Sequence, residues 1–303
     1  MKARDFFHTG LNVARSDLDG APFSPYGKNP SGADDYFVDG NVKISDDDTS
    51  INSPVKTLTE AIALSEASMG NSQNRWWARR NRIFIMGDRL TETLAALPQK
   101  CDIIGLGSCD SFKMAGLRGN HTPLTGNGTR WFNVHFDATS AADIFVFGTG
   151  TAGQPEFHNC EFKAVGGATA VSAIDITNVP YFKIINCDFI GAFSGPIIDI
   201  GAGAVNGCRI VGNWMSGGAD DGISETGVAT ATGTERGLIA NNYISVGVLT
   251  IDCAAISVFD IINNVLITPG AFGATSHVID LTYACGNKLT ANDAFSYVPP
   301  EPA

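Results

Sequence analysis

Aspartates at strand-like positions are the residues of this sequence best placed to do chemistry. The pattern apolar-Asp-apolar occurs at Asp175, Asp199, Asp252 and Asp280, and Ser224 holds the same place in a fifth segment. In a β-strand the apolar neighbours point inward and the acid points outward. If successive strands stack in register, Asp175 and Asp199 lie about 5 Å apart, the carboxyl separation of a retaining glycosidase, and Asp252 and Asp280 form a second pair beyond Ser224. This Asp stripe is therefore the best catalytic candidate.

Other interpretations of the Asp stripe need no catalysis. Outward acids could keep a rod soluble, block lateral association or meet basic groups of a neighbouring subunit. Two-carboxylate hydrolysis needs one protonated and one ionised acid in a cleft. The matching columns contain no nearby Arg, Lys or His, and the longest loop, about residues 216–237, consists mainly of small residues. We therefore expect solvated, ionised carboxylates without glycan-cleaving activity, and Asp175 and Asp199 are only weak candidates.

Metal and cofactor sites are not indicated by the remaining reactive residues. The acidic loop at Asp46–Asp48 could suit calcium. Its spacing fits no calcium loop, however, and a solvated turn is the simpler interpretation. The five histidines have no metal-ligand spacing, and Cys160 and Cys187 are expected to stack inward as reduced thiols. We expect no metal and no cofactor.

One six-residue pattern recurs from residue 131 onward and decides the fold class. Its seven copies begin at Trp131, Phe157, Ile184, Ile210, Ile239, Ile261 and Ala284. The fourth positions of successive copies are separated by unequal stretches of chain, as in a solenoid whose repeats carry insertions. Constant columns with variable spacing indicate stacked coils joined by loops of different length.

Each column of the repeat predicts one structural role. The third position is always Asn or Gly, which most readily adopt positive φ, so each coil turns sharply there. The fourth position is predicted to form an inward ladder in which Asn amides hydrogen-bond along the stack. The sixth position is always apolar and is predicted to form one buried stack. The fifth position varies freely in type and is expected to face outward.

Two aromatic side chains are adjacent in the outward fifth column. Trp214 and Tyr243 occupy successive copies of the repeat. Aromatic rings at the surface can stack against the apolar faces of sugar rings. The two residues are therefore weak candidates for a glycan-binding site.

The repeat predicts an all-β chain, namely a right-handed parallel β-helix over residues 83–292. Residues 36–82 should supply a leading strand, an acidic loop and a capping α-helix that begins at Ser53-Pro54 and ends at Gly70. Such a helix would cover strand edges that otherwise recruit other chains. Residues 1–35, which are broken by Gly and Pro, are expected to be an extended arm, and residues 293–303 a C-terminal tail.

Composition agrees with this architecture and excludes several function classes. Hydrophobic residues make up 44% of the 303-residue chain and charged residues 17%, and 34 residues are glycine. This mixture suits many short strands joined by tight turns. The formal net charge is −11 at pH 7, which disfavours nucleic-acid binding. No apolar run is long enough to span a membrane, and the N-terminus lacks the apolar segment of a signal peptide, so folding in a host cytoplasm is expected.

Several segments resemble the pectate-lyase-like superfamily of single-stranded right-handed parallel β-helices. They are the Asn turns with apolar stacks on either side, Tyr36-Phe37-Val38-Asp39-Gly40, Ser53-Pro54-Val55-Lys56-Thr57-Leu58 and Ala61-Ile62. The superfamily includes bacteriophage tailspikes and other virion proteins, lyases, hydrolases and inert structural proteins. The resemblance covers roughly residues 36–292. It implies the fold and leaves the function open.

The paired acids Asp220 and Asp221 are similar to those of polygalacturonase-like enzymes. The rest of that family's motif set is missing from this sequence, and a Gly-rich turn explains the pair more simply. Asp220 and Asp221 are accordingly weak catalytic candidates.

The sequence as a whole therefore favours a virion structural protein of phage type, either a capsid decoration, a spike or a tail component. We expect it to attach to other virion proteins through its N-terminal arm, and the resemblance implies a homotrimer. The alternatives are a polysaccharide lyase or hydrolase that uses the Asp stripe, and a module that binds a host surface glycan.

Overall fold

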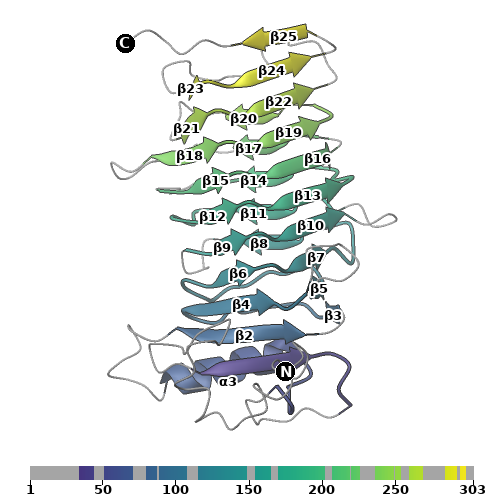
Figure 1. Ribbon diagram of the computed structural model, residues 1–303, viewed down its shortest axis with the longest axis vertical. Helices are drawn as coiled ribbons and strands as arrows, with labels where there is room; N and C mark the ends of the chain where they lie inside the picture. Colours follow the sequence, from purple (N-terminus) through teal and green to yellow (C-terminus); the bar gives the residue numbers. More distant parts are fainter. Residues whose placement is uncertain are drawn as a thin grey trace, which may run out of the picture.

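The computed structural model describes most of the chain from Asp34 onward (Figure 1). The described residues are 34–43, 51–70, 80–86, 89–107, 115–148, 154–164, 170–201, 207–218, 220–225, 236–248, 250–253, 259–268, 284–291 and 294–297. Residues 1–33 of the expected arm, the acidic loop at Asp46–Asp48 and Asp280 lie outside the described residues.

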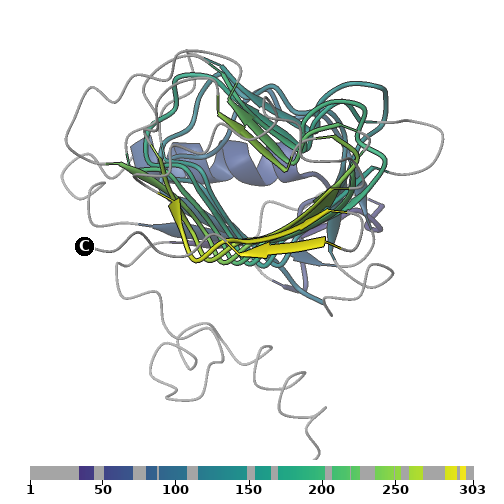
Figure 2. The same cartoon turned by 90° about the horizontal axis from the view of Figure 1, so that it is seen from above.

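The chain winds into a parallel β-helix with three sheets, which confirms the predicted fold class. Two ten-stranded sheets and one five-stranded sheet run along the rod, and viewed from its end the strands of each sheet lie over one another (Figures 1 and 2). The described strands pair in parallel, except for the last two strands of the second sheet. Parallel stacking lets each coil bury the apolar face of its neighbours in one continuous core.

The strands of each sheet follow one another along the rod. The first sheet contains β1 (Asp35–Asp39), β2 (Asn81–Met86), β4 (Cys101–Gly105), β6 (Arg130–Phe132), β9 (Glu156–His158), β12 (Lys183–Ile185), β15 (Arg209–Val211), β18 (Gly237–Ala240), β21 (Phe259–Ile262) and β23 (Ala284–Cys285). The second sheet contains β3 (Leu90–Thr91), β5 (Gly116–Arg118), β7 (His135–Asp137), β10 (Glu161–Ala164), β13 (Asp188–Gly191), β16 (Trp214–Gly218), β19 (Tyr243–Val246), β22 (Val265–Thr268), β24 (Lys288–Ala291) and β25 (Ala294–Tyr297). The third sheet contains β8 (Phe145–Phe147), β11 (Ile174–Ile176), β14 (Ile198–Ile200), β17 (Ile223–Glu225) and β20 (Ile251–Cys253).

A left-handed turn joins the first sheet to the second in every copy of the repeat. All seven third-position residues have positive φ between 51° and 72°, as predicted. They are Asn133, Asn159, Asn186, Gly212, Asn241, Asn263 and Gly286. A Cβ at Gly212 would lie 2.4 Å from Oδ1 of Asn186 on the preceding coil, so a larger residue there would force the Asn186 side chain to move.

The sixth-position residues form the predicted buried stack. The side chains of Phe136, Phe162, Phe189, Met215, Ile244 and Leu266 are fully buried. They pair in register on successive strands of the second sheet, and Leu289 continues the register. The rings of the three phenylalanines stack with centroids 4.9 Å apart.

The fourth-position asparagines form the predicted amide ladder. Nδ2 of Asn213, Asn242 and Asn264 donates to Oδ1 of the next asparagine at 2.9, 2.9 and 3.0 Å. The same Oδ1 atoms accept the backbone N–H of the preceding asparagine, each at 2.9 Å. All four asparagines, with Asn287 at the end, are at most 2% exposed. The ladder therefore satisfies polar groups that would otherwise be unpaired in the core.

Helix α3 (Leu58–Gly70) begins later than expected. Thr57, and not Ser53, occupies the N-cap position, because Thr57 Oγ1 accepts the Glu60 N–H and Glu60 Oε2 accepts the Thr57 N–H. Pro54 precedes the helix, and Val55 bridges to Val38 of β1. The helix ends at Gly70, as predicted, and lies beside β1 and β2 at the N-terminal end of the rod (Figure 1). Its role as a cap against other chains stays a prediction.

The two ends of the described chain take part in the sheets. Strand β1 pairs with β2, so the leading strand is the first strand of the first sheet. Strand β25 folds back against β24, so residues 294–297 of the expected tail extend the second sheet. Among the described residues, no helix has the length and apolar character needed to cross a membrane.

Candidate functional site

The described part of the Asp stripe lies in register on the third sheet, although Ser224 is buried and the pair Asp252 and Asp280 stays untested because Asp280 lies outside the described residues. Asp175 pairs in register with Asp199, Asp199 with Ser224, and Ser224 with Asp252. Parallel strands are separated by about 4.8 Å, so the two aspartates of the first pair lie next to each other across the sheet. The register makes the two aspartates side-by-side neighbours, which is the arrangement from which a pair of carboxyl groups could act in glycoside hydrolysis.

Asp175 is less solvated than the sequence led us to expect, and its carboxyl pKa lies above that of an isolated aspartate but below neutral pH. Burial raises the pKa of Asp175 from 3.8 to about 6, and the charges of Asp199 and Asp143 add to the effect. The side chain is only partly exposed. Sequence reasoning missed Asp143, which lies before β8 and accepts the Ser172 N–H at 2.8 Å. Asp175 therefore holds a proton more tightly than an isolated aspartate does.

Replacing Asp175 with asparagine should stabilise the protein above pH 6. The raised pKa of about 6 means that the native state binds more protons than the unfolded state at mildly acidic pH. The stability of the wild type therefore falls as pH rises through this range, whereas asparagine carries no charge to gain. Urea unfolding between about pH 4 and pH 7 should show a difference in unfolding free energy that grows with pH in favour of Asp175→Asn.

Asp260→Asn is the control for this pH dependence, because it removes a carboxylate that is ion-paired with Arg236. No gain in stability should occur in this variant as pH rises. If the unfolding free energies of Asp175→Asn and wild type changed equally with pH, the raised pKa of Asp175 would be contradicted.

The pair Asp220 and Asp221 directly precedes β17, the strand that carries Ser224. The side chain of Asp221 is largely buried, and its carbonyl accepts the Ile197 N–H at 2.9 Å. Gly222 follows at a position where a Cβ would lie 2.5 Å from the Thr250 carbonyl oxygen. These contacts are typical of a tight turn that leads into a strand. Whether Asp220 or Asp221 has a catalytic role stays untested.

Part of the fifth column is buried, which corrects the prediction that all of it faces solvent. His135 and Glu161 lie on the outer face of the second sheet but are at most 6% exposed. Nε2 of His135 lies 2.7 Å from Oδ1 of Asp137, and Nδ1 lies 3.3 Å from Oε1 of Glu161. Arg89 forms an ion pair with Asp137. Burial alone would lower the pKa of His135, but hydrogen bonds and charges from the two carboxylates raise it, so the cluster favours the imidazolium.

Trp214 and Tyr243, the glycan-binding candidates, stack on each other in register. Their ring centroids are 4.1 Å apart and the rings are nearly parallel. One face of each ring is therefore occupied by the other ring. Trp214 is nevertheless 49% exposed, because its register neighbour on the opposite side is the short side chain of Asp188. Of the two faces of the Trp214 ring, the one toward Tyr243 is covered, and the one toward Asp188 is open to a ligand.

A row of paired charges on the first sheet was missed by sequence reasoning. Its members lie in register on the outer face of successive strands, in the order Asp35, Arg82, Asp102, Arg130, Glu156, Lys183 and Arg209. We call this row the charge ladder. Signs alternate along its first six members, so neighbouring side chains attract one another. Only the strand register could reveal it, because its members are separated by loops of different length.

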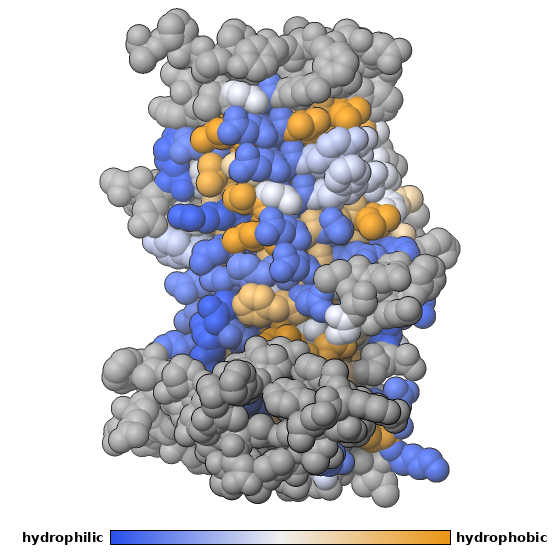
Figure 3. All heavy atoms as spheres, in the orientation of Figure 1, coloured by the Kyte–Doolittle hydropathy of each residue, from blue (hydrophilic) through white to orange (hydrophobic). Residues whose placement is uncertain are grey.

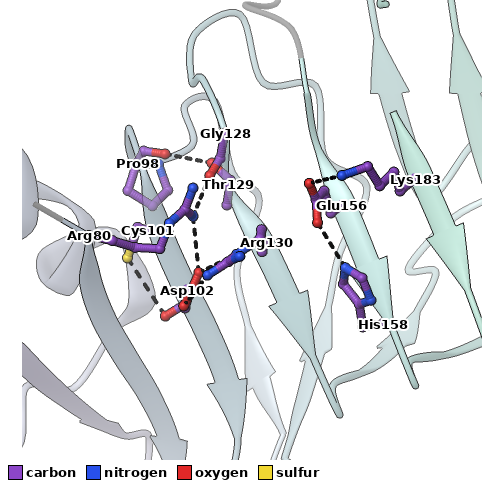
Figure 4. Close-up of polar contacts among 10 residues, drawn as sticks. All are labelled: Arg80, Pro98, Cys101, Asp102, Gly128, Thr129, Arg130, Glu156, His158 and Lys183. Atoms are coloured by element: carbon purple, nitrogen blue, oxygen red, sulfur yellow. Dashed lines mark hydrogen bonds and ion pairs between the residues drawn. The ribbon is translucent and has the colours of Figure 1, made fainter. Parts of the chain in front are cut away.

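Each acid of the charge ladder has a cation of its own chain. Nε and Nη2 of Arg130 both donate to the Asp102 carboxylate at 2.7 Å, and Nη1 of Arg80 adds a third contact at 3.0 Å (Figure 4). Lys183 Nζ and His158 Nε2 contact the Glu156 carboxylate at 2.7 and 2.9 Å (Figure 4). Burial alone would raise the pKa of Glu156, but these hydrogen bonds and the Lys183 charge lower it to about 2.

Beside the charge ladder runs a second outward row, which is almost entirely apolar. We call it the apolar stripe, and its members in register are Phe37, Phe84, Ile104, Phe132, His158, Ile185, Val211, Ala240 and Ile262. All except Phe84 and Ala240 are partly exposed. Figure 3 shows apolar side chains among polar ones on the face made by the first and second sheets. Outward positions of a solvated sheet are normally polar, so this row points to a covered surface.

The described residues show no group of three or more His, Cys, Asp or Glu side chains arranged to hold a metal ion. Cys160 and Cys187 are buried free thiols, each of which contacts a backbone carbonyl oxygen two residues earlier at 3.4 Å. Burial, followed by the neighbouring Cys160, raises the pKa of Cys187, so its thiol stays protonated. This confirms the expected reduced, inward thiols.

No protein-family model and no curated protein matches this chain. Among solved structures, the tailspike protein of Acinetobacter phage vB_ApiP_P1 is similar, with a TM-score of 0.34 and 13% sequence identity. The similar region covers 80% of this chain and 61% of the tailspike chain, so it spans less than two thirds of the tailspike.

Proposed function

We propose that the protein is a structural β-helical rod of a phage-type particle, of the tail or spike kind, which associates lengthwise with copies of itself. The observation that carries the proposal is the apolar stripe on the outer face of the first sheet. An exposed apolar row along a sheet invites association, and burying it removes apolar surface from water. A structural role in which copies of the rod pack against one another needs no catalytic centre.

The three faces of the rod differ in what they could contact. The first sheet carries the apolar stripe and the charge ladder. The outer face of the third sheet carries the Asp stripe, which repels an identical face. The second sheet presents a mixed surface in which Lys163, Ile190, Ser216 and Ser245 follow one another in register. Among the described residues, only the first sheet therefore offers a long apolar contact.

The charge ladder makes the first sheet compatible with a close contact between copies. The whole chain carries a formal charge of −11 at pH 7, so two copies repel each other on average. On this face, however, Asp35, Asp102, Glu156 and Asp260 are each paired with a cation of their own chain. These four carboxylates therefore need no cation from outside.

The shape of the apolar stripe favours a second copy as the partner. The stripe runs across successive strands of the first sheet from β1 to β21. Such strands are spaced regularly at about 4.8 Å, so the stripe forms a straight band along most of the rod. A rod with the same repeat along its axis can match this band over its whole length. We propose a homotrimer, which the family resemblance implies, with attachment to other virion proteins through residues 1–35.

Replacing Ile185 with lysine should disrupt the association without unfolding the rod. Ile185 lies in the apolar stripe, and an unpaired ammonium buried in the contact costs about 3 kcal/mol, which weakens association about 100-fold. Sedimentation velocity of the full chain should show an oligomer that dissociates in Ile185→Lys. Ile190→Lys on the second sheet is the matched control, because Ile190 is 40% exposed and lies outside the stripe. A monomeric wild type, or equal behaviour of both variants, would contradict the proposed contact.

Location in a particle needs a separate test. Mass spectrometry of purified phage particles, with gold-labelled antibodies against this chain in electron microscopy, should detect the protein at fixed positions on the particle. Its absence from intact particles would overturn the virion assignment, whatever the oligomeric state of the isolated rod.

One observation favours a second candidate function, the cleavage of a polysaccharide by the Asp stripe. Asp175, with its pKa of about 6, could stay protonated while its register neighbour Asp199 is ionised. A two-carboxylate mechanism needs this difference. The test is to follow new reducing ends from a polysaccharide panel with wild type, Asp175→Asn and Asp199→Asn. Product formation that both variants abolish would favour the enzyme, and no product from any of the three would leave the structural rod as the function.

A further inference from the structure

We propose that the second sheet carries a binding site for a protonated amino sugar, formed by the free face of Trp214 and the carboxylate of Asp188. The inference extends the proposed function, because it assigns a ligand class to a surface of the rod. It rests on the register of three strands, on ring geometry and on charge.

The stacked rings fix the direction in which Trp214 is open. Trp214 pairs with Tyr243 on β19 and with Asp188 on β13. Tyr243 covers one face of the indole at a centroid distance of 4.1 Å. Rings that stack between neighbouring strands have their planes roughly perpendicular to the rod axis. The second face of the Trp214 ring is therefore directed along the rod toward β13. An aspartate is shorter than an indole, and the outer part of this face therefore extends past Asp188.

The charge beside this open face is negative and lacks a cation in the described structure. Asp188 is exposed, and no ion pair joins it to a cation among the described residues. Its next register neighbour, Glu161, is directed to His135. Lys163, the nearest outward lysine on β10, pairs in register with Asp137 and Ile190, not with Asp188. Partial burial and then the Glu161 charge raise the pKa of Asp188.

An aromatic face beside a carboxylate selects a cation that carries an apolar surface. A cation within about 6 Å of a Trp ring contributes about 0.5–2 kcal/mol, and a hydrogen bond to a charged group about 1.5–3 kcal/mol. A pyranose with a free amine supplies both, because its C–H face can stack on the indole while its ammonium reaches the carboxylate. Ser216, two positions along β16 from Trp214, offers a hydroxyl group to the sugar. A lone lysine side chain would use the carboxylate but leave this hydroxyl unused.

Calorimetric titration of the full chain with a glucosamine tetrasaccharide and with its N-acetylated counterpart tests the proposal. At a pH where the amine is protonated, the free amine should bind about tenfold more tightly, which corresponds to about 1.4 kcal/mol. Asp188→Asn should remove this preference, and Trp214→Ala should remove binding of both sugars. Leu124→Ala is the matched control, because it truncates another exposed apolar side chain, 68% exposed and outside the second sheet.

Three outcomes would overturn the amino-sugar site. The first is equal binding of the two tetrasaccharides, and the second is unchanged selectivity in Asp188→Asn. The third is binding of Nα-acetyl-lysine amide, which keeps its side-chain ammonium, as tight as that of the amino sugar, which would indicate a protein partner. None of them bears on the rod itself. Asp188→Asn and Trp214→Ala should still sediment like wild type, so loss of the site and loss of the rod function are distinguishable.

Discussion

Replacing Phe162 with alanine is expected to lower the free energy of unfolding by about 3–5 kcal/mol, the usual cost of deleting a buried phenylalanine. Phe162 is fully buried, and its ring stacks on Phe136 and Phe189, with both centroid distances at 4.9 Å. It also meets Phe145 and Phe157 edge-on, at 6.5 and 5.3 Å. A coil cannot collapse onto the cavity, because the hydrogen bonds between strands fix its distance to the coils on either side.

Chemical denaturation followed by far-ultraviolet circular dichroism measures this effect. Ile190→Ala is the matched control, because Ile190 lies on the adjacent strand but points outward and is 40% exposed. Its truncation should cost well under about 1 kcal/mol, as surface substitutions usually do. If both variants unfolded at the same denaturant concentration, the inward and outward positions of the second sheet would be wrongly assigned.

Replacing Asn242 with alanine should cost about 2–5 kcal/mol by breaking the amide ladder, because each unsatisfied buried polar group costs about 1–3 kcal/mol. Asn242 Oδ1 accepts both the backbone N–H and the Nδ2 of Asn213. Its own Nδ2 donates to Asn264 Oδ1 and to the Ile210 carbonyl oxygen. Alanine leaves two donors of Asn213 without their acceptor in a buried site.

Asn242→Asp separates the hydrogen bonding of the ladder from its packing. Aspartate has nearly the same shape, but it places an oxygen opposite Asn264 Oδ1 and the Ile210 carbonyl oxygen and buries a charge. It should therefore destabilise the rod more than alanine does at neutral pH. The burial raises the carboxyl pKa, so the native state holds the proton more tightly and stability should be partly recovered as pH falls.

Unfolding of Asn242→Asp at several pH values, with Ser245→Ala as the control, checks this expectation. Ser245 lies on β19, the strand that directly follows Asn242, and is an outward, partly exposed residue. A variant as stable as wild type at neutral pH would show that the ladder does not stabilise the core.

Local backbone chemistry and periodicity were sufficient to predict the architecture. Asn and Gly adopt positive φ at little cost, so the turn column could be identified from residue type alone, and all seven turns are present. The apolar sixth column and the Asn ladder followed from alternation around that turn. The in-register pair Asp175 and Asp199 was predictable for the same reason, since each is the central residue of the equivalent strand of its coil.

Local sequence signals were less reliable in two situations. One is a helix start for which two N-cap residues compete, and the other is a strand face that other segments of the chain cover. Ser53-Pro54 carries the usual signal of a helix start, but Val55 pairs with β1, and the capping interactions form at Thr57. His135 and Glu161 occupy outward positions and are nevertheless buried. Burial of an outward residue depends on what packs over it, and the alternation of a strand carries no information about that.

The sequence by itself determined that the chain is a stack of parallel coils, because the same turn and the same buried positions recur in every repeat. Only the tertiary structure decided what the outer faces present. The charge ladder joins residues as far apart as Asp35 and Lys183, and the Trp214 face opens toward Asp188 because Tyr243 covers the other side. The raised pKa of Asp175 likewise depends on its burial and on its neighbours Asp199 and Asp143. Strand register brings these side chains together across loops of unequal length, so their proximity has no fixed spacing along the chain.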